Sequence, residues 1–212
     1  MAVSLDFEKQ AQSVGFRFIA GVDEVGRGCL AGAVVAAACI LDLSKPIPDG
    51  LDDSKKLSAK RREELEQRIK ETAIAFAVAQ VEADEIDQIN ILQATKKAMR
   101  SAIAALTPKP DFLLIDALKI DGLSIPQLSL VNGDAISASI AAASIIAKTY
   151  RDRLMKEIDK IYPNYGFAKN VGYATKEHLK ALRVYGPCAL HRKTFRPINQ
   201  IISNGPRQSS LF

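Results

Sequence analysis

The sequence has few of the residues that build disulfide frameworks or zinc sites. Its 212 residues include only two histidines and three cysteines, Cys29, Cys39 and Cys188. The cysteine number is odd and no Cys-x-x-Cys pair occurs, so neither a disulfide framework nor a cysteine zinc site is expected. A reducing compartment fits best, and we expect the protein to be cytoplasmic.

Long apolar runs are also absent. The longest, residues 30–41, has 12 residues and is rich in alanine, well short of the roughly 20 that a membrane helix requires. The first eight residues carry acids where a secretory signal has basic residues and then an apolar stretch, so no leader is expected. With 48% hydrophobic residues, the chain is expected to form one globular core, with room for a small appended subdomain.

Charge is distributed unevenly along the chain. Residues 148–212 contain 13 Lys and Arg against 4 Asp and Glu, whereas residues 1–147 contain 16 against 20. This concentration of positive charge in the C-terminal third predicts a polyanionic partner, most commonly nucleic acid. A solvated basic surface is the alternative.

The pattern of apolar and polar residues predicts alternating strands and helices. Two apolar runs flank a charged turn that contains glycine, and further strands and helices follow. Strands are expected at residues 17–22, 30–41, 73–81, 112–115 and 126–131, and helices at residues 58–70, 89–106 and 135–161. The mixture predicts an α/β layered architecture with a mixed sheet.

Carboxylates stand at the ends of two predicted strands. Asp23 and Glu24 follow the run at residues 18–22, and Asp116 follows the run at residues 112–115. An ionised carboxylate beside a buried strand is costly unless a partner such as a cation compensates it. Sites for Mg²⁺ or Mn²⁺ are commonly built from a few carboxylates and phosphate oxygens. The pattern indicates metal-assisted phosphoryl chemistry, with phosphatases, kinases and polymerases still open.

Asp134 precedes a helix that is rich in small residues. Because aspartate is a favoured N-cap, these residues alone favour a capping role for it. The sequence has no Gly-x-Ser-x-Gly elbow, no phosphate-binding Walker loop and no convincing Ser-His-Asp or Cys-His pairing. These absences favour hydrolysis by activated water.

The motifs themselves resemble a known family. Residues 21–28, Gly-Val-Asp-Glu-Val-Gly-Arg-Gly, are similar to the opening signature of bacterial ribonuclease HII. Further segments resemble the same family in order, at residues 53–57, 89–94, 114–116, 139–148, 172–175 and 191–195. The resemblance covers residues 17–198.

This resemblance implies a ribonuclease H-like three-layer fold, with a five-stranded mixed sheet and a small helical C-terminal extension. We therefore expect four segments. They are an N-terminal lead-in (1–16), a catalytic core (17–162), a C-terminal substrate-binding extension (163–200) and a flexible tail (201–212).

The resemblance also implies a divalent-metal-dependent endoribonuclease, using Mn²⁺ or Mg²⁺. Such an enzyme cuts 5′ to ribonucleotides embedded in duplex DNA, and cuts the RNA of RNA–DNA hybrids, leaving 3′-hydroxyl and 5′-phosphate ends. Its four catalytic, metal-binding acids would be Asp23, Glu24, Asp116 and Asp134. This implication reverses the preference for Asp134 as a cap alone, since one residue can do both jobs. We expect a monomer that acts in ribonucleotide removal.

Substrate contacts follow from the same resemblance. An enzyme that finds one ribonucleotide in DNA must sense its 2′-hydroxyl. Gly26-Arg27-Gly28 offers backbone that can approach a sugar closely beside a cation, and Tyr173 would complete this recognition. Candidate phosphate contacts are Ser54, Lys55, Asn90, Lys148 and Arg192. His178 and His191 are interpreted as structural or phosphate-side residues, not metal ligands.

Several residues depart from the family pattern. Cys29 and Ala33 stand where proline is usual, Ala117 stands where glycine is common, and Asn132 replaces a more usual Lys or Asp. These departures keep every expected carboxylate, but they leave the metal preference open.

The last five residues, Gln208-Ser-Ser-Leu211-Phe212, are similar to the peptide by which replication proteins bind the sliding clamp. We expect clamp binding through Gln208, Leu211 and Phe212, with a disordered tail as the alternative. Two other functions remain open, namely a nucleic-acid-binding protein without hydrolysis and another ribonuclease H-like nuclease such as a junction resolvase. Ribonuclease HIII fits poorly, since its signature departs from Gly-Arg-Gly.

Overall fold

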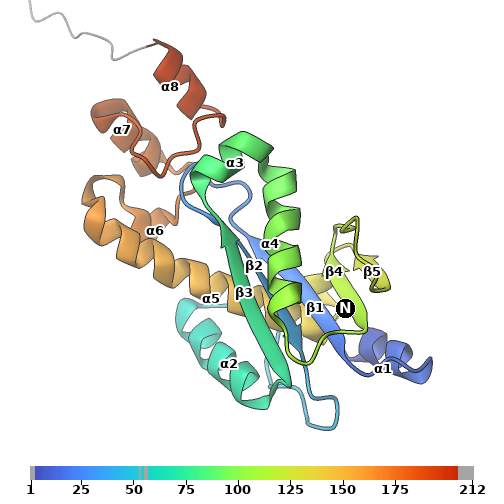
Figure 1. Cartoon of the computed structure of the whole chain (residues 1–212). Helices are drawn as coiled ribbons and strands as arrows, with labels where there is room; N and C mark the ends of the chain where they lie inside the picture. Colours follow the sequence, from blue (N-terminus) through green and yellow to red (C-terminus); the bar gives the residue numbers. More distant parts are fainter. Residues whose placement is uncertain (1–2, 53, 55–56, 205–212) are drawn as a thin grey trace, which may run out of the picture.

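A five-stranded mixed sheet forms the centre of the molecule (Figure 1). The computed structural model describes residues 3–52, 54 and 57–204. The strands are β1 (Ile19–Val25), β2 (Val34–Ile40), β3 (Ala75–Val81), β4 (Phe112–Asp116) and β5 (Gln127–Leu130), in the order β3-β2-β1-β4-β5. Strands β1, β2 and β3 pair antiparallel, whereas β4 is parallel to both β1 and β5. The predicted α/β fold with a mixed sheet is confirmed.

Helices cover both faces of the sheet, which gives three layers. Helix α4 (Ile91–Ala105) packs on one face, and α5 (Ala138–Ile161) packs on the other with α2 (Ala59–Thr72) beside it. The small residues at the start of α5 allow a very close approach to β1. A Cβ atom added to Gly21 would lie only 2.0 Å from the backbone carbon of Ser139. Glycine at position 21 therefore allows this close approach of α5 to β1.

One predicted helix is divided in the structure, and another begins as predicted. The helix predicted at residues 89–106 is two helices, α3 (Ala83–Ile89) and α4, because Asn90 adopts a φ of 66° between them. The side chain of Asn90 accepts hydrogen bonds from the backbone N–H groups of Leu92 and Gln93 and so begins α4. The charged helix α2 begins as predicted, with Ser58 as its N-cap.

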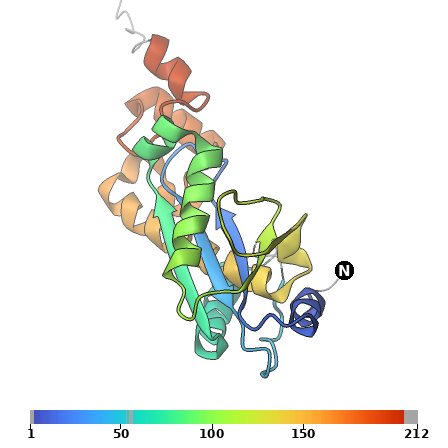
Figure 2. The same cartoon turned by 45° about the vertical axis from the view of Figure 1, so that its right-hand side comes forward.

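Short elements lie at both ends of the chain. An unpredicted helix, α1 (Asp6–Ser13), precedes β1. The C-terminal part consists of η2 (Pro163–Tyr165), α6 (Phe167–Asn170), α7 (Lys176–Tyr185) and α8 (Ile198–Asn204). In both views α7 and α8 lie at the opposite end of the molecule from α1 (Figures 1 and 2).

The C-terminal part has its own core of buried side chains, centred on Tyr165, Phe167 and Leu182. Helix α8 continues past residue 200, where we predicted a flexible tail to begin. Among the described residues, no helix is both long and apolar enough to cross a membrane.

Candidate active site

Asp23 and Glu24 lie within β1, not in the turn where the apolar pattern placed them. They pair in register with Ala37 and Ala36 of β2. Side chains alternate between the two faces of a strand, so Asp23 shares the α5 face with Gly21 and Glu24 points to the other face. Asp23 is 4% exposed, which makes its ionised form costly.

Asp116 is the last residue of β4, the parallel neighbour of β1. Because Val22 pairs with Ile115, Asp23 and Asp116 occupy the corresponding next positions on the two strands and share a face. The backbone N–H of Gly133 donates a hydrogen bond of 2.7 Å to Asp116 Oδ1. This bond ties the end of β4 to the 3₁₀ turn η1 (Gly133–Ala135).

Asp134 lies in η1 and is buried. The cap of α5 is Ser137, whose hydroxyl accepts from the N–H of Ile140, so the interpretation of Asp134 as the helix cap is wrong. Three further residues separate Asp134 from the first residue of α5, which leaves the capping position to the serine. The hydrogen bond from Gly133 to Asp116 holds the turn that carries Asp134 against the end of β4. The four predicted acids thus come from β1, β4 and η1.

Burial and repulsion by neighbouring acids destabilise the charges of Asp23 and Glu24. The pKa of Asp23 is raised well above its usual value, first by burial and then by Glu24 and Asp116. Burial also raises the pKa of Glu24, against the opposing effect of Arg27, whose Nη1 lies 3.1 Å from Glu24 Oε1. A bound cation would relieve both effects.

The donor atoms of the site fit a divalent cation. Glu24 Oε2 is buried without a hydrogen-bond partner among the described residues, and carboxylate oxygens are the preferred ligands of Mg²⁺ and Mn²⁺. In the described part of the chain, no three Asp, Glu, His or Cys side chains are grouped closely enough to hold an ion by themselves. An open arrangement is typical of Mg²⁺ sites that one or two carboxylates share with waters and substrate phosphates.

A cavity of about 410 Å³, here called the catalytic cavity, opens beside Asp23 and Glu24. It brings together predicted residues that are far apart in the sequence. Its lining consists of Asp23, Glu24, Val25, Ser54, Arg62, Ser144, Lys148 and Tyr173. The hydroxyl oxygens of Ser54 and Ser144 are 2.9 Å apart, and a Ser144 hydrogen bond favours the ionised form of Asp23 by lowering its pKa. Asp116 and Asp134 are outside the lining.

Arg192 holds the Gly26-Arg27-Gly28 loop and does not offer its charge to a phosphate. Its guanidinium is 0% exposed. It donates to the carbonyl oxygens of Gly26 (2.7 Å), Arg27 (2.8 Å) and Gly32 (2.9 and 3.1 Å). The prediction that Arg192 contacts phosphate is therefore corrected to a positioning role. Arg27 keeps a side chain that is 40% exposed.

A second buried arginine, Arg151, links this loop to the segment that carries Tyr173. It donates to the carbonyl oxygens of Ala31, Ala33 and Val171. Val171 adopts a φ of 43°, which is rare for a β-branched residue. The backbone held in this way leaves Tyr173 41% exposed on the wall of the catalytic cavity.

His178 and His191 form a buried pair beneath Tyr173. Their Nε2 atoms are 3.0 Å apart, and Nδ1 of His178 lies 2.8 Å from the carbonyl oxygen of Tyr173. Burial and the neighbouring His178 lower the pKa of His191 to about 4. At 0% and 1% exposure, the two histidines are structural and do not face phosphate.

The structure does not test the predicted roles of the remaining five residues. Asn90 is exposed and caps α4, so its predicted substrate contact remains a prediction. Lys55 and the tail residues Gln208, Leu211 and Phe212 lie outside the described residues.

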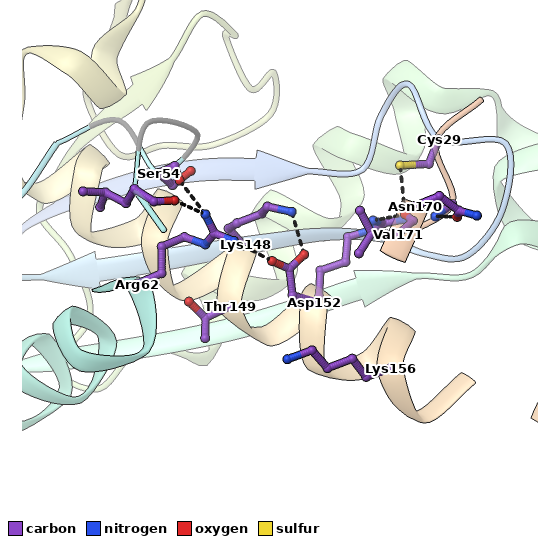
Figure 3. Close-up of polar contacts among 12 residues, drawn as sticks. Cys29, Ser54, Arg62, Lys148, Thr149, Asp152, Lys156, Asn170 and Val171 are labelled. Atoms are coloured by element: carbon purple, nitrogen blue, oxygen red, sulfur yellow. Dashed lines mark hydrogen bonds and ion pairs between the residues drawn. The ribbon is translucent and has the colours of Figure 1, made fainter. Parts of the chain in front are cut away.

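The sequence interpretation missed Arg62, which donates to the backbone of Ser54 and Leu57 and to Asp152 (Figure 3). Its position in the first turn of α2 could have revealed this role. A cation is unfavourable near the N-terminus of a helix because of the helix dipole, so an arginine there is expected to have a specific partner.

Comparisons with known proteins agree with this geometry. Residues 20–198 match the family Ribonuclease HII. A Ribonuclease HII of Desulfitobacterium hafniense is 58% identical over 193 residues, which cover 91% of this chain and 74% of the relative.

Two solved structures share the fold. A PCNA:RNase HII complex from Archaeoglobus fulgidus contains a chain with a TM-score of 0.73 and 25% identity, covering 89% of this chain and 100% of that one. A Bst-RNase HIII structure in complex with Mn²⁺ has a TM-score of 0.67 and 22% identity, covering 93% and 73%. The matched region contains the sheet from Ala20 onward and the candidate site, and the chain therefore belongs to the ribonuclease HII family of divalent-metal-dependent endonucleases.

Proposed function

We propose that this chain hydrolyses the phosphodiester bond on the 5′ side of ribonucleotides embedded in duplex DNA, and of RNA in RNA–DNA hybrids. The products would carry 3′-hydroxyl and 5′-phosphate ends. The observation that carries the proposal is the cavity in which Asp23 and Glu24 of β1 meet Tyr173 and Lys148. The neighbouring elements β4 and η1, which carry Asp116 and Asp134, are tied together by the hydrogen bond from Gly133 to Asp116.

The four acids Asp23, Glu24, Asp116 and Asp134 would hold Mg²⁺ or Mn²⁺. When bound, a divalent cation supplies activation of the attacking water and stabilisation of charge on the leaving 3′ oxygen. Asp23 is oriented for this task by its bonds to the Glu24 N–H (2.7 Å) and to Ser144. The free oxygen Glu24 Oε2 supports a role as a ligand.

Recognition of the ribose would come from the loop that Arg192 holds. Its four hydrogen bonds fix the backbone around Gly26 and Arg27 next to Glu24. A rigid backbone beside the cavity can approach a 2′-hydroxyl, the group that distinguishes RNA from DNA. Arg27 would neutralise the scissile phosphate, and Tyr173 would pack against the neighbouring sugar.

Several other assignments belong to the same proposal. Residues 163–200 would form the substrate-binding extension of a core at 17–162, supported by the presence of Val171 and Tyr173 in cavity walls. The tail residues Gln208, Leu211 and Phe212 would bind the sliding clamp, an assignment supported by the complex that the Archaeoglobus fulgidus RNase HII forms with PCNA. We propose a cytoplasmic monomer.

The test is cleavage of a labelled DNA duplex that contains one ribonucleotide, resolved at single-nucleotide length, with Mg²⁺ or Mn²⁺. Matched duplexes contain only DNA, or a 2′-O-methyl ribose at the same position. We expect a single cut on the 5′ side of the ribonucleotide and none in either control. Equal cutting of the all-DNA duplex would favour a resolvase-like nuclease, and binding without a cut would favour a protein that lacks hydrolysis.

A further inference from the structure

A second, smaller cavity adjoins the catalytic cavity on the α2 side. It encloses about 250 Å³ between α2, α5 and α6. Its lining consists of Ala59, Arg62, Glu63, Lys148, Thr149, Asp152, Lys156, Ala168, Lys169 and Val171. Arg62 and Lys148 line both cavities, so they form a common wall. None of the cations that line only the second cavity was singled out from the sequence.

Asp152, which lines the second cavity, is already neutralised by the two cations of the common wall. Asp152 Oδ1 lies 2.6 Å from Lys148 Nζ, and Asp152 Oδ2 lies 3.0 Å from Arg62 Nη2 (Figure 3). All three side chains are less than one-fifth exposed. Asp152 therefore fixes the two cations in place, with one cation at each of its two oxygens.

Two lysines on the outer part of the cavity keep most of their charge uncompensated. Lys156 is half-exposed, and its nearest acid, Glu63, is 3.9 Å away. Lys169 is exposed and has no ion-pair partner among the residues that the structure describes. The cavity thus has four cations against two acids, Glu63 and Asp152, and its excess of positive charge is suited to a phosphate group.

The spacing along α5 connects this cavity to the catalytic acids. Ser144, Lys148, Asp152 and Lys156 follow one another at intervals of four residues and so form a row of neighbouring side chains that turns around the helix by about 40° per step. At 1.5 Å per residue, Ser144 and Lys156 are separated by roughly 18 Å along the helix axis. A duplex rises about 3.4 Å per nucleotide, so this row would span roughly five nucleotides of a duplex that runs parallel to α5.

We propose that the second cavity is a phosphate subsite, which binds a backbone phosphodiester of the substrate roughly three to five nucleotides from the scissile bond. The inference rests on the proposed function, because the occupant is the same nucleic acid. Lys156 and Lys169 contact the phosphate, while Asp152 positions Arg62 and Lys148. The subsite adds affinity and register without reading sequence.

The experiment compares two double variants with equal loss of charge. Lys156→Gln with Lys169→Gln removes the available cations of the subsite. Lys9→Gln with Lys109→Gln removes two exposed lysines, in α1 and in the loop before β4, that line neither cavity. Steady-state cleavage of the single-ribonucleotide duplex is measured over a range of salt, and thermal melting checks that both proteins are folded.

We expect the subsite variant to raise KM roughly 3- to 10-fold, with kcat within about twofold of wild type. The slope of log affinity against log salt concentration should be smaller by about one, which corresponds to the loss of one phosphate contact. Shortening the duplex from each end in turn should abolish the difference from wild type on one side, when roughly three to five nucleotides remain.

Equal KM values and salt slopes for the two double variants would overturn the subsite. A difference that persists at every duplex length would also overturn it, because only long-range attraction would explain that result. Failure of the wild-type protein to cut at the ribonucleotide would instead refute the proposed function. In that case duplex binding, measured by fluorescence anisotropy with the same variants, still tests the subsite.

Discussion

Replacing Arg192 by methionine tests whether this arginine positions the Gly26-Arg27-Gly28 loop or contacts a phosphate of the substrate. Arg192 is fully buried and donates four hydrogen bonds to three carbonyl oxygens. An acceptor left buried without a partner costs about 1–3 kcal/mol. The methionine variant no longer has to bury a guanidinium charge, which offsets part of this cost. We therefore expect Arg192→Met to lower the free energy of unfolding by about 3 kcal/mol.

For a domain of this size, about 3 kcal/mol corresponds to a fall of roughly 6–12 °C in Tm. Thermal unfolding followed by circular dichroism measures it, with Lys193→Met as the control because the neighbouring lysine is exposed. A surface cation that only contacts phosphate would change stability by no more than about 0.5 kcal/mol. A Tm within about 2 °C of wild type, together with a shallower salt dependence of binding, would refute the positioning role.

Three further predictions follow from the same structure. Gly21→Ala should destabilise the protein by at least about 3 kcal/mol, because its Cβ would overlap the Ser139 backbone; chemical denaturation measures this, and a loss below about 1 kcal/mol would contradict the close approach. His191, with its pKa lowered to about 4, takes up a proton on unfolding, so stability present above about pH 6.5 should decline by about 1.4 kcal/mol per pH unit as the pH falls toward 4. If the stability of His191→Asn declined with falling pH as steeply as that of wild type, His191 would not be the cause of the decline. Asp23→Asn relieves the repulsion with Glu24 and Asp116 and should raise Tm without metal while reducing the rise in Tm that Mn²⁺ gives to wild type; an equal rise in both proteins would contradict metal binding at Asp23.

The sheet and the strand-end acids could be predicted from local patterns. Buried strands produce apolar runs in the sequence, and Asp23 and Asp116 interrupt two such runs at their ends. The precise end of β1 could not be predicted, because a buried carboxylate appears polar in sequence even where the backbone continues its pairing to Val25.

Roles that depend on distant partners could not be predicted. Arg192 looks like a surface cation until its partners, 160–166 residues earlier in the chain, are known. Asp134 precedes a helix, but the backbone inserts a 3₁₀ turn and passes the capping role to Ser137. Asn90 breaks a continuous helical pattern through a left-handed φ that its neighbours do not signal.

The central claim is that four acids from β1, β4 and η1 form one catalytic metal site. Its most direct test is the single-turnover cleavage rate of a duplex with one ribonucleotide, for Asp23→Asn, Glu24→Gln, Asp116→Asn and Asp134→Asn, each with Mg²⁺ or Mn²⁺. The exposed acid Glu157, changed to glutamine, is the control. We predict that each of the four variants loses at least about 100-fold in rate, whereas Glu157→Gln cuts at the wild-type rate; a wild-type rate for any of the four would contradict the site as described.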